Sequence, residues 1–255
     1  MDASVLFDIE QKDVFVGGKV VPDKKAIINK DTSQVIGIVG SHYVPMPNKD
    51  LFQHCVDILD KCKMPFNVSD GHLIQGGSKT VIEINIQGEQ IKVTDNDPLM
   101  LKIYLVNSFD GYSSARLIAG FVRLVCENGM TIGQKEFALA YRHVGNINDL
   151  IVEDFRKYVT NKNKEMLKFV AKLTQITFRD EVQIYGIIDE SKWIPGKYHK
   201  ALITQAETMK ILNGWELFNV FSYVITHAIE RNIEGKLKFY RKLNEEAEKW
   251  KTTNN

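Results

Sequence analysis

The chain has 255 residues, 44% of them hydrophobic, which is enough to build a sizeable core without disulfide bonds. Its three cysteines, Cys55, Cys62 and Cys126, are odd in number and widely spaced, which argues against a disulfide framework and predicts a reducing compartment. The N-terminus lacks the basic and apolar regions of a signal peptide, and no segment is long and apolar enough to span a bilayer. We therefore expect a cytoplasmic protein with no membrane partner.

The net charge of +1 hides an uneven distribution along the chain. Residues 1–100 contain 10 Lys and Arg against 14 Asp and Glu, whereas residues 101–255 contain 23 against 18. The positive charge is thus concentrated in the second part of the chain. This asymmetry permits a polyanionic partner without requiring one.

The first 62 residues predict a small β-meander followed by a helix. Short β-like segments are separated by Gly17, Gly18, Pro22 and a polar loop; they cover residues 14–16, 20–21, 26–29 and 35–39. Asn48 is a good N-cap for a helix that ends near Cys62. Apolar residues recur on one side of that helix at helical spacing, which predicts one buried face.

Residues 66–142 predict a mainly antiparallel sheet. Strands at 81–87 and 91–94 are expected to form a hairpin at Gly88–Glu89, and a further strand covers 99–106. A turn at Asp110–Gly111 leads into the run 116–126, which is almost entirely apolar and therefore predicts a central strand covered on both faces. A last strand is expected at 137–142.

After Gly145 the apolar residues follow a helical period. We predict a helix over 151–176 that is either continuous or broken near 160–163, and an irregular connector over 178–199. A buried helix that begins at Asn213 and an amphipathic final helix over 233–250 follow. The fold class is therefore α+β. Residues 1–145 form the mainly antiparallel β domain with one helix (48–62), and residues 146–255 form a helical region that packs on the sheet as part of one compact unit.

Enzymatic and metal-binding motifs are missing from the sequence. It contains no G-x-G-x-x-G, G-x-S-x-G or H-E-x-x-H motif, and its six histidines have no second ligand at helical or turn spacing. We therefore predict no cofactor, no metal site and no catalytic residues.

Two polar segments lie next to strongly apolar ones. The first, which we call the polar knot, comprises Asn107, Ser108, Asp110, Gly111, Ser113 and Ser114. The second is a polar line within the buried helix that includes Asn219, Thr226 and His227. Because buried polar groups require hydrogen bonds, the two sets could form a structural network that docks the helix on the sheet, or they could line a shared polar pocket.

Four lysines form a stripe along the predicted helix. Lys157, Lys164, Lys168 and Lys172 stand at offsets of seven, eleven and fifteen residues, which confines them to a sector of about 80°. Such a row can follow a phosphate backbone, although an ordinary solvated face has the same pattern. Nearby aromatic residues could serve as stacking surfaces for unpaired bases: Tyr158, Phe178, Tyr185 and Trp193. Arg116 and Arg123 would add charge from the sheet, but they have opposite parity and need a bulge at Gly120 to share a face.

Three blocks of the sequence resemble a known family, the phage and plasmid-like proteins of mobile elements described as domain of unknown function 932. The blocks are VGSHYVPMPN at 39–48, NSFDGYSSARLIAGFVRLVCENGM at 107–130 and NGWELFNVFSYVITHAIERN at 213–232. The resemblance implies a phage or mobile-element protein in the bacterial cytoplasm, near replication, recombination or counter-defence functions. A meander packed on helices is also similar to the core of phage single-strand annealing recombinases.

These observations leave three hypotheses. The leading one is a non-enzymatic accessory protein that binds nucleic acid, above all single-stranded DNA, in annealing or recombination. The alternative is a protein-binding module whose partner is a host or phage protein, with the aromatic residues of 185–198 as the contact surface. A third is an enzyme whose site contains Asp110 and His227. Homo-oligomers are compatible with each of the three.

Overall fold

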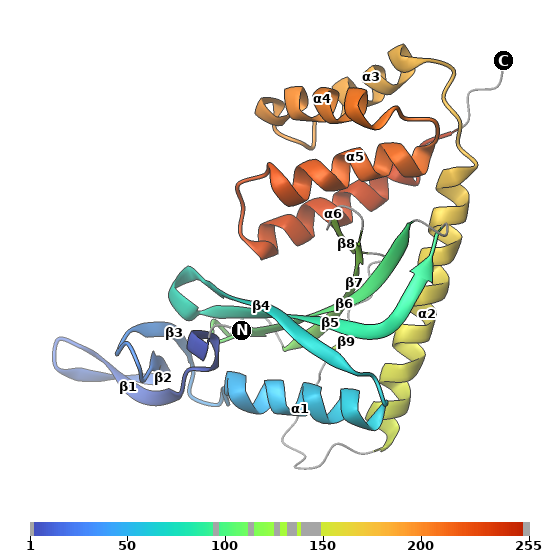
Figure 1. Cartoon of the computed structure of the whole chain (residues 1–255). Helices are drawn as coiled ribbons and strands as arrows, with labels where there is room; N and C mark the ends of the chain where they lie inside the picture. Colours follow the sequence, from blue (N-terminus) through green and yellow to red (C-terminus); the bar gives the residue numbers. More distant parts are fainter. Residues whose placement is uncertain are drawn as a thin grey trace. The chain divides into compact units, whose positions relative to one another are not determined.

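The computed structural model describes residues 3–93, 97–111, 115–124, 128–131, 137–138 and 149–251. Strands dominate the first part of the chain and helices dominate the second (Figure 1). The predicted α+β class, with antiparallel sheets followed by helices, is confirmed.

The first three strands form a small antiparallel sheet, as the meander prediction required. They are β1 (Ile9–Val16), β2 (Lys19–Asn29) and β3 (Val35–Gly40), in the order β1-β2-β3. Gly17 and Gly18 close the β1–β2 hairpin with φ angles of 57° and 74°, which side chains with a Cβ rarely adopt. Three side chains of this sheet, Ile27, Ile36 and Val39, form a buried apolar cluster with Phe7 and Phe109.

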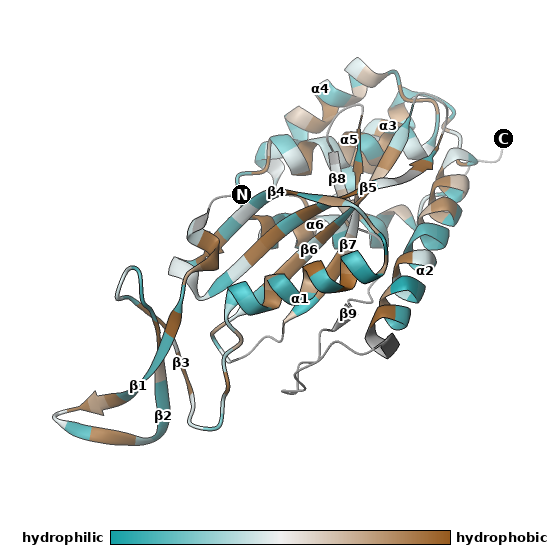
Figure 2. Cartoon of the chain, turned by 60° about the horizontal axis from the view of Figure 1, so that its bottom comes forward, coloured by the Kyte–Doolittle hydropathy of each residue, from teal (hydrophilic) through white to brown (hydrophobic). Residues whose placement is uncertain are grey.

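Helix α1 (Asn48–Lys61) is amphipathic, as predicted. It buries Leu51, Cys55 and Ile58, while hydrophilic residues occupy its other side (Figure 2). The predicted N-cap is wrong, because the cap position is Pro47 and the side chain of Asn48 makes no capping bond. That side chain is engaged in buried hydrogen bonds elsewhere, so it is not available to the first helical turn.

The second sheet has six strands. They are β4 (Phe66–Ile74), β5 (Lys79–Lys92), β6 (Pro98–Ser108), β7 (Arg116–Arg123), β8 (Asn128–Thr131) and β9 (Phe137–Ala138). The order is β4-β5-β6-β7-β8, and β9 also pairs with β7. Strand β7 thus has neighbours on both sides and is largely buried, which confirms the prediction of a central strand.

The predicted hairpin at Gly88–Glu89 is wrong. Strand β5 runs through Gly88, whose φ of 82° bends the strand without reversing it. A glycine inside a strand commonly marks such a bend, so its presence alone could not distinguish a bend from a turn. The predicted strand ends at Thr94, Cys126 and Arg142 lie outside the described residues.

The second part of the chain contains five helices within the described residues: α2 (Asp149–Thr174), α3 (Glu181–Glu190), α4 (His199–Met209), α5 (Gly214–His227) and α6 (Ile233–Ala247). The predictions of α5 and α6 are confirmed. Asn213 and Glu216 form the capping box at the start of α5, with each side chain bonded to the other residue's backbone N–H.

Of the two alternatives for the helix over 151–176 the continuous one is observed, whereas the prediction of a connector over 178–199 is wrong. Helix α2 has no break at 160–163, because the buried Val159 and Met166 hold both sides of that segment in one helix. The predicted connector 178–199 contains helix α3, which Asp180 caps by accepting a hydrogen bond from the backbone N–H of Gln183. Its β-branched residues and Gly186 have low helix propensity, but capping and the burial of Ile184 and Ile188 outweigh this preference.

The chain divides into two compact units that alternate along the sequence. Unit 1 comprises Met1–Gly88, Lys102–Ala119 and Glu136–Tyr158, and unit 2 comprises Glu89–Leu101, Gly120–Lys135 and Val159–Asn255. Strands β5, β6 and β7 and helix α2 each begin in one unit and end in the other. The predicted boundary at 145–146 falls within the last segment of unit 1.

Candidate functional site

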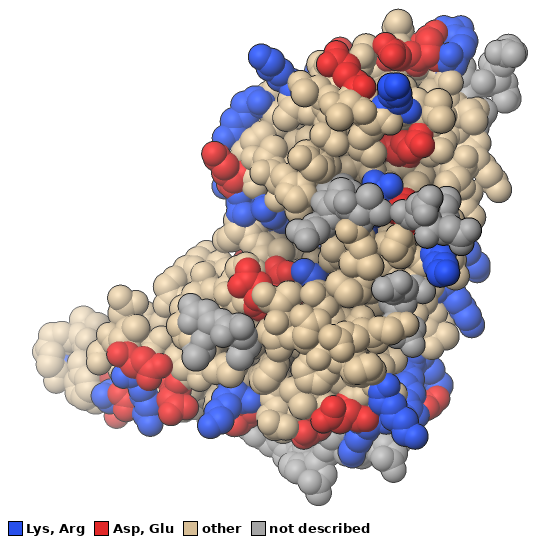
Figure 3. Space-filling view, in the orientation of Figure 1, with Lys and Arg blue, Asp and Glu red and all other residues tan. Residues whose placement is uncertain are grey.

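Helix α2 carries the predicted lysine stripe. Lys157, Lys164, Lys168 and Lys172 are all exposed, and the helix is continuous from the first to the last of them. Figure 3 shows Lys and Arg side chains along the edge of the view where α2 lies in Figure 1. The other side of α2 holds the helix in place through buried apolar residues: Val152, Phe155, Val159, Met166, Phe169, Val170 and Leu173.

The four lysines differ in their charge environment. Lys157 lies 3.7 Å from the carboxylate of Glu153, and Lys172 is paired with Glu248. Lys164 and Lys168 form no ion pair with any residue that the structure describes. Exposed ion pairs contribute only about 0–1 kcal/mol, so a phosphate group could replace either glutamate at little cost. The stripe therefore has two open ammonium groups between two weakly engaged ones.

The two predicted arginines have different surroundings. The guanidinium Nε of Arg123 donates to Oδ1 of the buried Asp97 at 2.5 Å, and Oδ2 of Asp97 accepts from the indole N–H of Trp215 at 3.0 Å. Arg123 thus takes part in a buried network of unit 2. Arg116 lies at the other end of β7, in unit 1, and is half-buried. That both arginines contact nucleic acid stays a prediction.

The polar knot is the centre of a buried hydrogen-bond network in unit 1. The Asn107 amide donates to the backbone oxygen of Met46 at 2.9 Å and to Oδ1 of Asn48 at 2.8 Å, and its own oxygen accepts from the N–H of Ser108. Asn48 in turn donates to the carbonyl of Val5 and accepts from the hydroxyl of Thr80. These bonds tie α1, β5 and β6 together.

The rest of the knot is more exposed. Asp110 lies 3.5 Å from the ammonium group of Lys79, and Gly111 has a φ of 77° that suits the predicted turn. Burial, aided by the charge of Asp110, raises the pKa of the Tyr43 hydroxyl, which donates to the carbonyl of Ser108. Two members of the predicted site, Ser113 and Ser114, lie outside the described residues.

The polar line of α5 bonds within unit 2. The amide of the fully buried Asn219 donates to the carbonyl of Trp215 at 2.8 Å. The Thr226 hydroxyl donates to the carbonyl of Ser222, accepts from the N–H of Gly129 and shares a hydrogen bond with the hydroxyl of Tyr240. His227 is exposed, with its ring 4.5 Å from that of Tyr223. A pocket shared between this line and the knot stays a prediction.

A charged cluster on β4, β5 and β6 was not foreseen. One carboxylate oxygen of Glu83 accepts a hydrogen bond from His72 Nε2 at 2.9 Å, and the other accepts one from the Lys102 ammonium group at 2.6 Å. The carboxylate of Asp70 lies 3.6 Å from the same nitrogen of His72. Glu83 is 9% exposed. A charged residue within an apolar run is a signal that could have identified Glu83 in the sequence. The residues that pair with Glu83 are known only from the pairing of the strands.

The cluster shifts the pKa values of its members. Burial by itself raises the pKa of Glu83, but hydrogen bonds and charges from His72 and Lys102 outweigh burial and hold this pKa below its usual range. The hydrogen bond to Glu83, aided by the charges of Glu83 and Asp70, raises the pKa of His72 against the opposing effects of burial and Lys102. The cluster therefore favours the protonated form of the imidazole.

The stability of the protein should follow the protonation of His72. The pKa of His72 in the folded protein lies above its unfolded value of about 6.5. The stabilisation by the contact between protonated His72 and Glu83 is therefore complete below pH 6.5, and it is lost as the pH rises through the folded pKa. His72→Asn should therefore lower the urea midpoint more at pH 5 than at pH 8.5. His42→Asn, at an exposed position of unit 1, is the matched control. Equal losses at both pH values would contradict the assignment.

Three further features bear on the site. No helix in the described ranges combines the length and the apolar character needed to cross a membrane. Among the same residues, no three His, Cys, Asp or Glu side chains are grouped to hold a metal ion.

Cys55 and Cys62 are free, and burial raises the pKa of Cys55 to about 12, as expected of a cysteine that acts as a small hydrophobe. Cys126 lies outside the described residues.

Comparison with known proteins gives one match. Residues 35–192 match the family model described as "Domain of unknown function (DUF932)". No curated protein and no solved structure matches the chain significantly. The matched segment contains two of the three resembling blocks, the lysine stripe and the Glu83 cluster, whereas the block at 213–232 lies beyond it. Because this match covers more than half of the chain, the chain belongs to the family of the domain of unknown function 932.

Proposed function

We propose that the protein binds single-stranded DNA as a non-enzymatic accessory factor of a phage or other mobile element, in annealing or recombination. One observation carries the proposal: a continuous helix presents four exposed lysines on one side, two of them without an ion-pair partner in the described chain. The phage or mobile-element setting rests on the resemblance of the quoted sequence blocks.

The stripe suits a flexible anionic chain. Lys164, Lys168 and Lys172 follow one another at intervals of four residues, which is about 6 Å along the helix axis, and the exposed Leu167 lies beside them. Lysine ammonium groups act as point charges that bind phosphates without requiring a fixed geometry. A strand can therefore lie along α2 in more than one register.

Base stacking should contribute less to binding than the sequence predicts, because two of the four aromatic residues near the stripe are engaged elsewhere. The hydroxyl of Tyr158 accepts from the backbone N–H of Ala119, and the ring of Trp193 stacks on Phe221 at 5.7 Å. Both aromatic residues are thus engaged in packing within their own units. Phosphate contacts should consequently dominate, and binding should depend strongly on salt and weakly on base sequence.

The test is fluorescence anisotropy of a labelled oligothymidine titrated with the protein over a series of salt concentrations. Each phosphate contact to a single strand contributes about −0.7 to the slope of log K against log salt, so four lysines predict a slope of about −3. A second titration with a duplex of the same length measures the preference for single strands. Flat anisotropy at low salt would contradict the proposal.

Charge reversal locates the binding surface. The double variant Lys164→Glu and Lys168→Glu should weaken oligothymidine binding at least thirtyfold at low salt, because two phosphate contacts are replaced by repulsion. The matched control reverses Lys192 and Lys200, which are exposed lysines of the same unit outside α2, and so produces the same change of net charge. Equal losses in the two variants would show that net charge, and not the stripe, determines affinity.

A further inference from the structure

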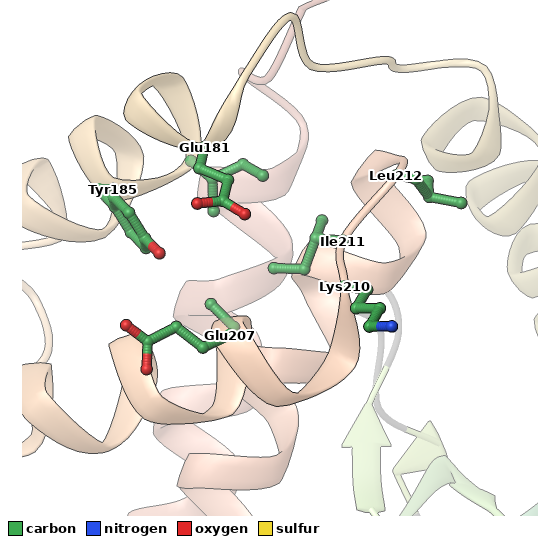
Figure 4. Close-up of a pocket in the computed structure, with 8 residues that line it drawn as sticks. Glu181, Tyr185, Glu207, Lys210, Ile211 and Leu212 are labelled. Atoms are coloured by element: carbon green, nitrogen blue, oxygen red, sulfur yellow. The ribbon is translucent and has the colours of Figure 1, made fainter.

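A pocket of about 350 Å³ lies between helices α3 and α4 of unit 2 (Figure 4). Its polar lining consists of Glu181 and Tyr185 from α3, Glu207 from α4 and Lys210, the C-cap of α4. Its apolar lining includes Ile184, Ala206 and Ile211. None of the four stripe lysines lines the pocket, and the two carboxylates of its lining outnumber the one ammonium group of Lys210.

The local fold explains why these side chains meet. Glu181 is the first residue of α3, directly after its cap Asp180, and Tyr185 lies one turn later on the same side. Helix α4 ends at Met209, and the left-handed φ of 49° at its C-cap, Lys210, turns the chain so that Ile211 lies in the pocket wall. In Figure 4 the carboxylate of Glu181 points toward the hydroxyl of Tyr185, while the amine of Lys210 points away from both.

The negative charge in the pocket is neutralised only in part, because Lys210 belongs to the lining but its amine points away from Glu181 and Tyr185 (Figure 4). Neither Glu181 nor Glu207 forms an ion pair with a residue of the described ranges. Burial raises the pKa of the Tyr185 hydroxyl, and both carboxylates raise it further because they oppose the phenolate. The field at the pocket mouth therefore favours a cation and repels the phosphates of a nucleic acid.

The surroundings of the pocket are apolar. Val182, which follows Glu181, is 76% exposed, and Leu212, which lines the pocket, is 72% exposed. Within the described chain no other large hydrophobic side chain is as exposed as these two. An acidic pocket beside exposed aliphatic side chains suits a polypeptide whose basic residue is flanked by apolar ones.

We propose that this pocket binds the arginine side chain of a partner polypeptide. The guanidinium group lies between the carboxylates of Glu181 and Glu207 and over the ring of Tyr185, and the aliphatic stem packs against Ile184 and Ile211. Apolar residues next to the arginine contact Val182 and Leu212. The pocket thus gives the protein a polypeptide partner in addition to nucleic acid, through a different surface.

The test uses two peptides and the full-length protein. The probe is acetyl-Leu-Arg-Leu-amide, and its neutral isostere has citrulline in place of arginine. Titration of ¹⁵N-labelled protein should shift the backbone amides of α3 and α4 in a saturable manner, with at least tenfold weaker binding of the citrulline peptide. Equal binding of the two peptides, or saturable shifts confined to other elements, would overturn the proposal.

Variants assign the recognition to the two carboxylates. The double variant Glu181→Gln and Glu207→Gln should weaken binding of the arginine peptide at least tenfold. The control Asp189→Asn and Glu190→Gln removes two exposed carboxylates of α3 that do not line the pocket, and it should retain full affinity. Equal affinities of the two double variants would overturn the proposal. Self-association of the protein that the first variant alone abolishes would assign the pocket to a second copy and would also overturn it.

Discussion

Replacing Gly37 with alanine should lower the free energy of unfolding by about 3 kcal/mol or more, as measured by urea denaturation. A Cβ atom at this position of β3 would lie 2.1 Å from the backbone oxygen of Phe109 and 3.0 Å from its carbonyl carbon. No side-chain rotation can relieve a clash with backbone. Phe109 belongs to the buried cluster that includes three side chains of the first sheet, so the core itself must shift.

Gly40 provides the matched control for this prediction. It ends the same strand, and a Cβ atom there would have no neighbour within 4 Å. Gly40→Ala should therefore change the free energy of unfolding by less than about 1 kcal/mol. Similar losses in the two variants would mean that alanine disturbs β3 for a reason other than the contact with Phe109.

Replacing Asp97 with alanine should lower the stability of unit 2 by about 3–5 kcal/mol, because it leaves the largely buried charge of Arg123 without the Asp97 carboxylate. The Asp97 carboxylate is 9% exposed and accepts hydrogen bonds from both Arg123 and Trp215. These bonds connect the segment before β6, the end of β7 and the start of α5.

Two further variants separate charge from hydrogen bonding at this position. Asp97→Asn keeps one acceptor oxygen and removes the negative charge, so it should lose less stability than Asp97→Ala but more than a surface substitution. Asp189→Ala, on the exposed side of α3, should change the free energy of unfolding by no more than about 0.5 kcal/mol. If Asp97→Ala were as mild as Asp189→Ala, the buried network would have no part in holding unit 2 together.

The elements that were predicted correctly are those whose signals are local. The start of α5 follows from Asn213 and Glu216, because a capping box needs only two side chains three residues apart. The central position of β7 follows from an unbroken apolar run. The hairpin of the first sheet follows from two adjacent glycines.

The errors arise where packing outweighs local preference. Gly88 resembles a turn residue until its neighbours in the sheet are known, and α3 resembles a connector until Ile184 and Ile188 are seen to be buried. Asn48 has the chemistry of a helix cap, yet Asn107 and Thr80, distant in sequence, engage its side chain. Composition gives no indication of which partner such a side chain chooses.

The candidate site was likewise predicted only in part. Helical periodicity placed the four lysines on one side of α2, but the partner of Lys172 is 76 residues away in the sequence. Asp97 and Trp215 are 118 residues apart, so the engagement of Arg123 in a buried network has no local signal. The acidic pocket needs α3 and α4, neither of which the sequence pattern revealed.

The alternation of the two units along the sequence has a consequence for synthesis on the ribosome. Unit 1 is incomplete until Tyr158 has been made, and by then Glu89–Leu101 and Gly120–Lys135 of unit 2 have already been synthesised. Most of their unit, Val159–Asn255, follows them. Their apolar strand residues thus lack most of their unit until Val159–Asn255 has been made, and a nascent chain of this protein needs protection by chaperones there.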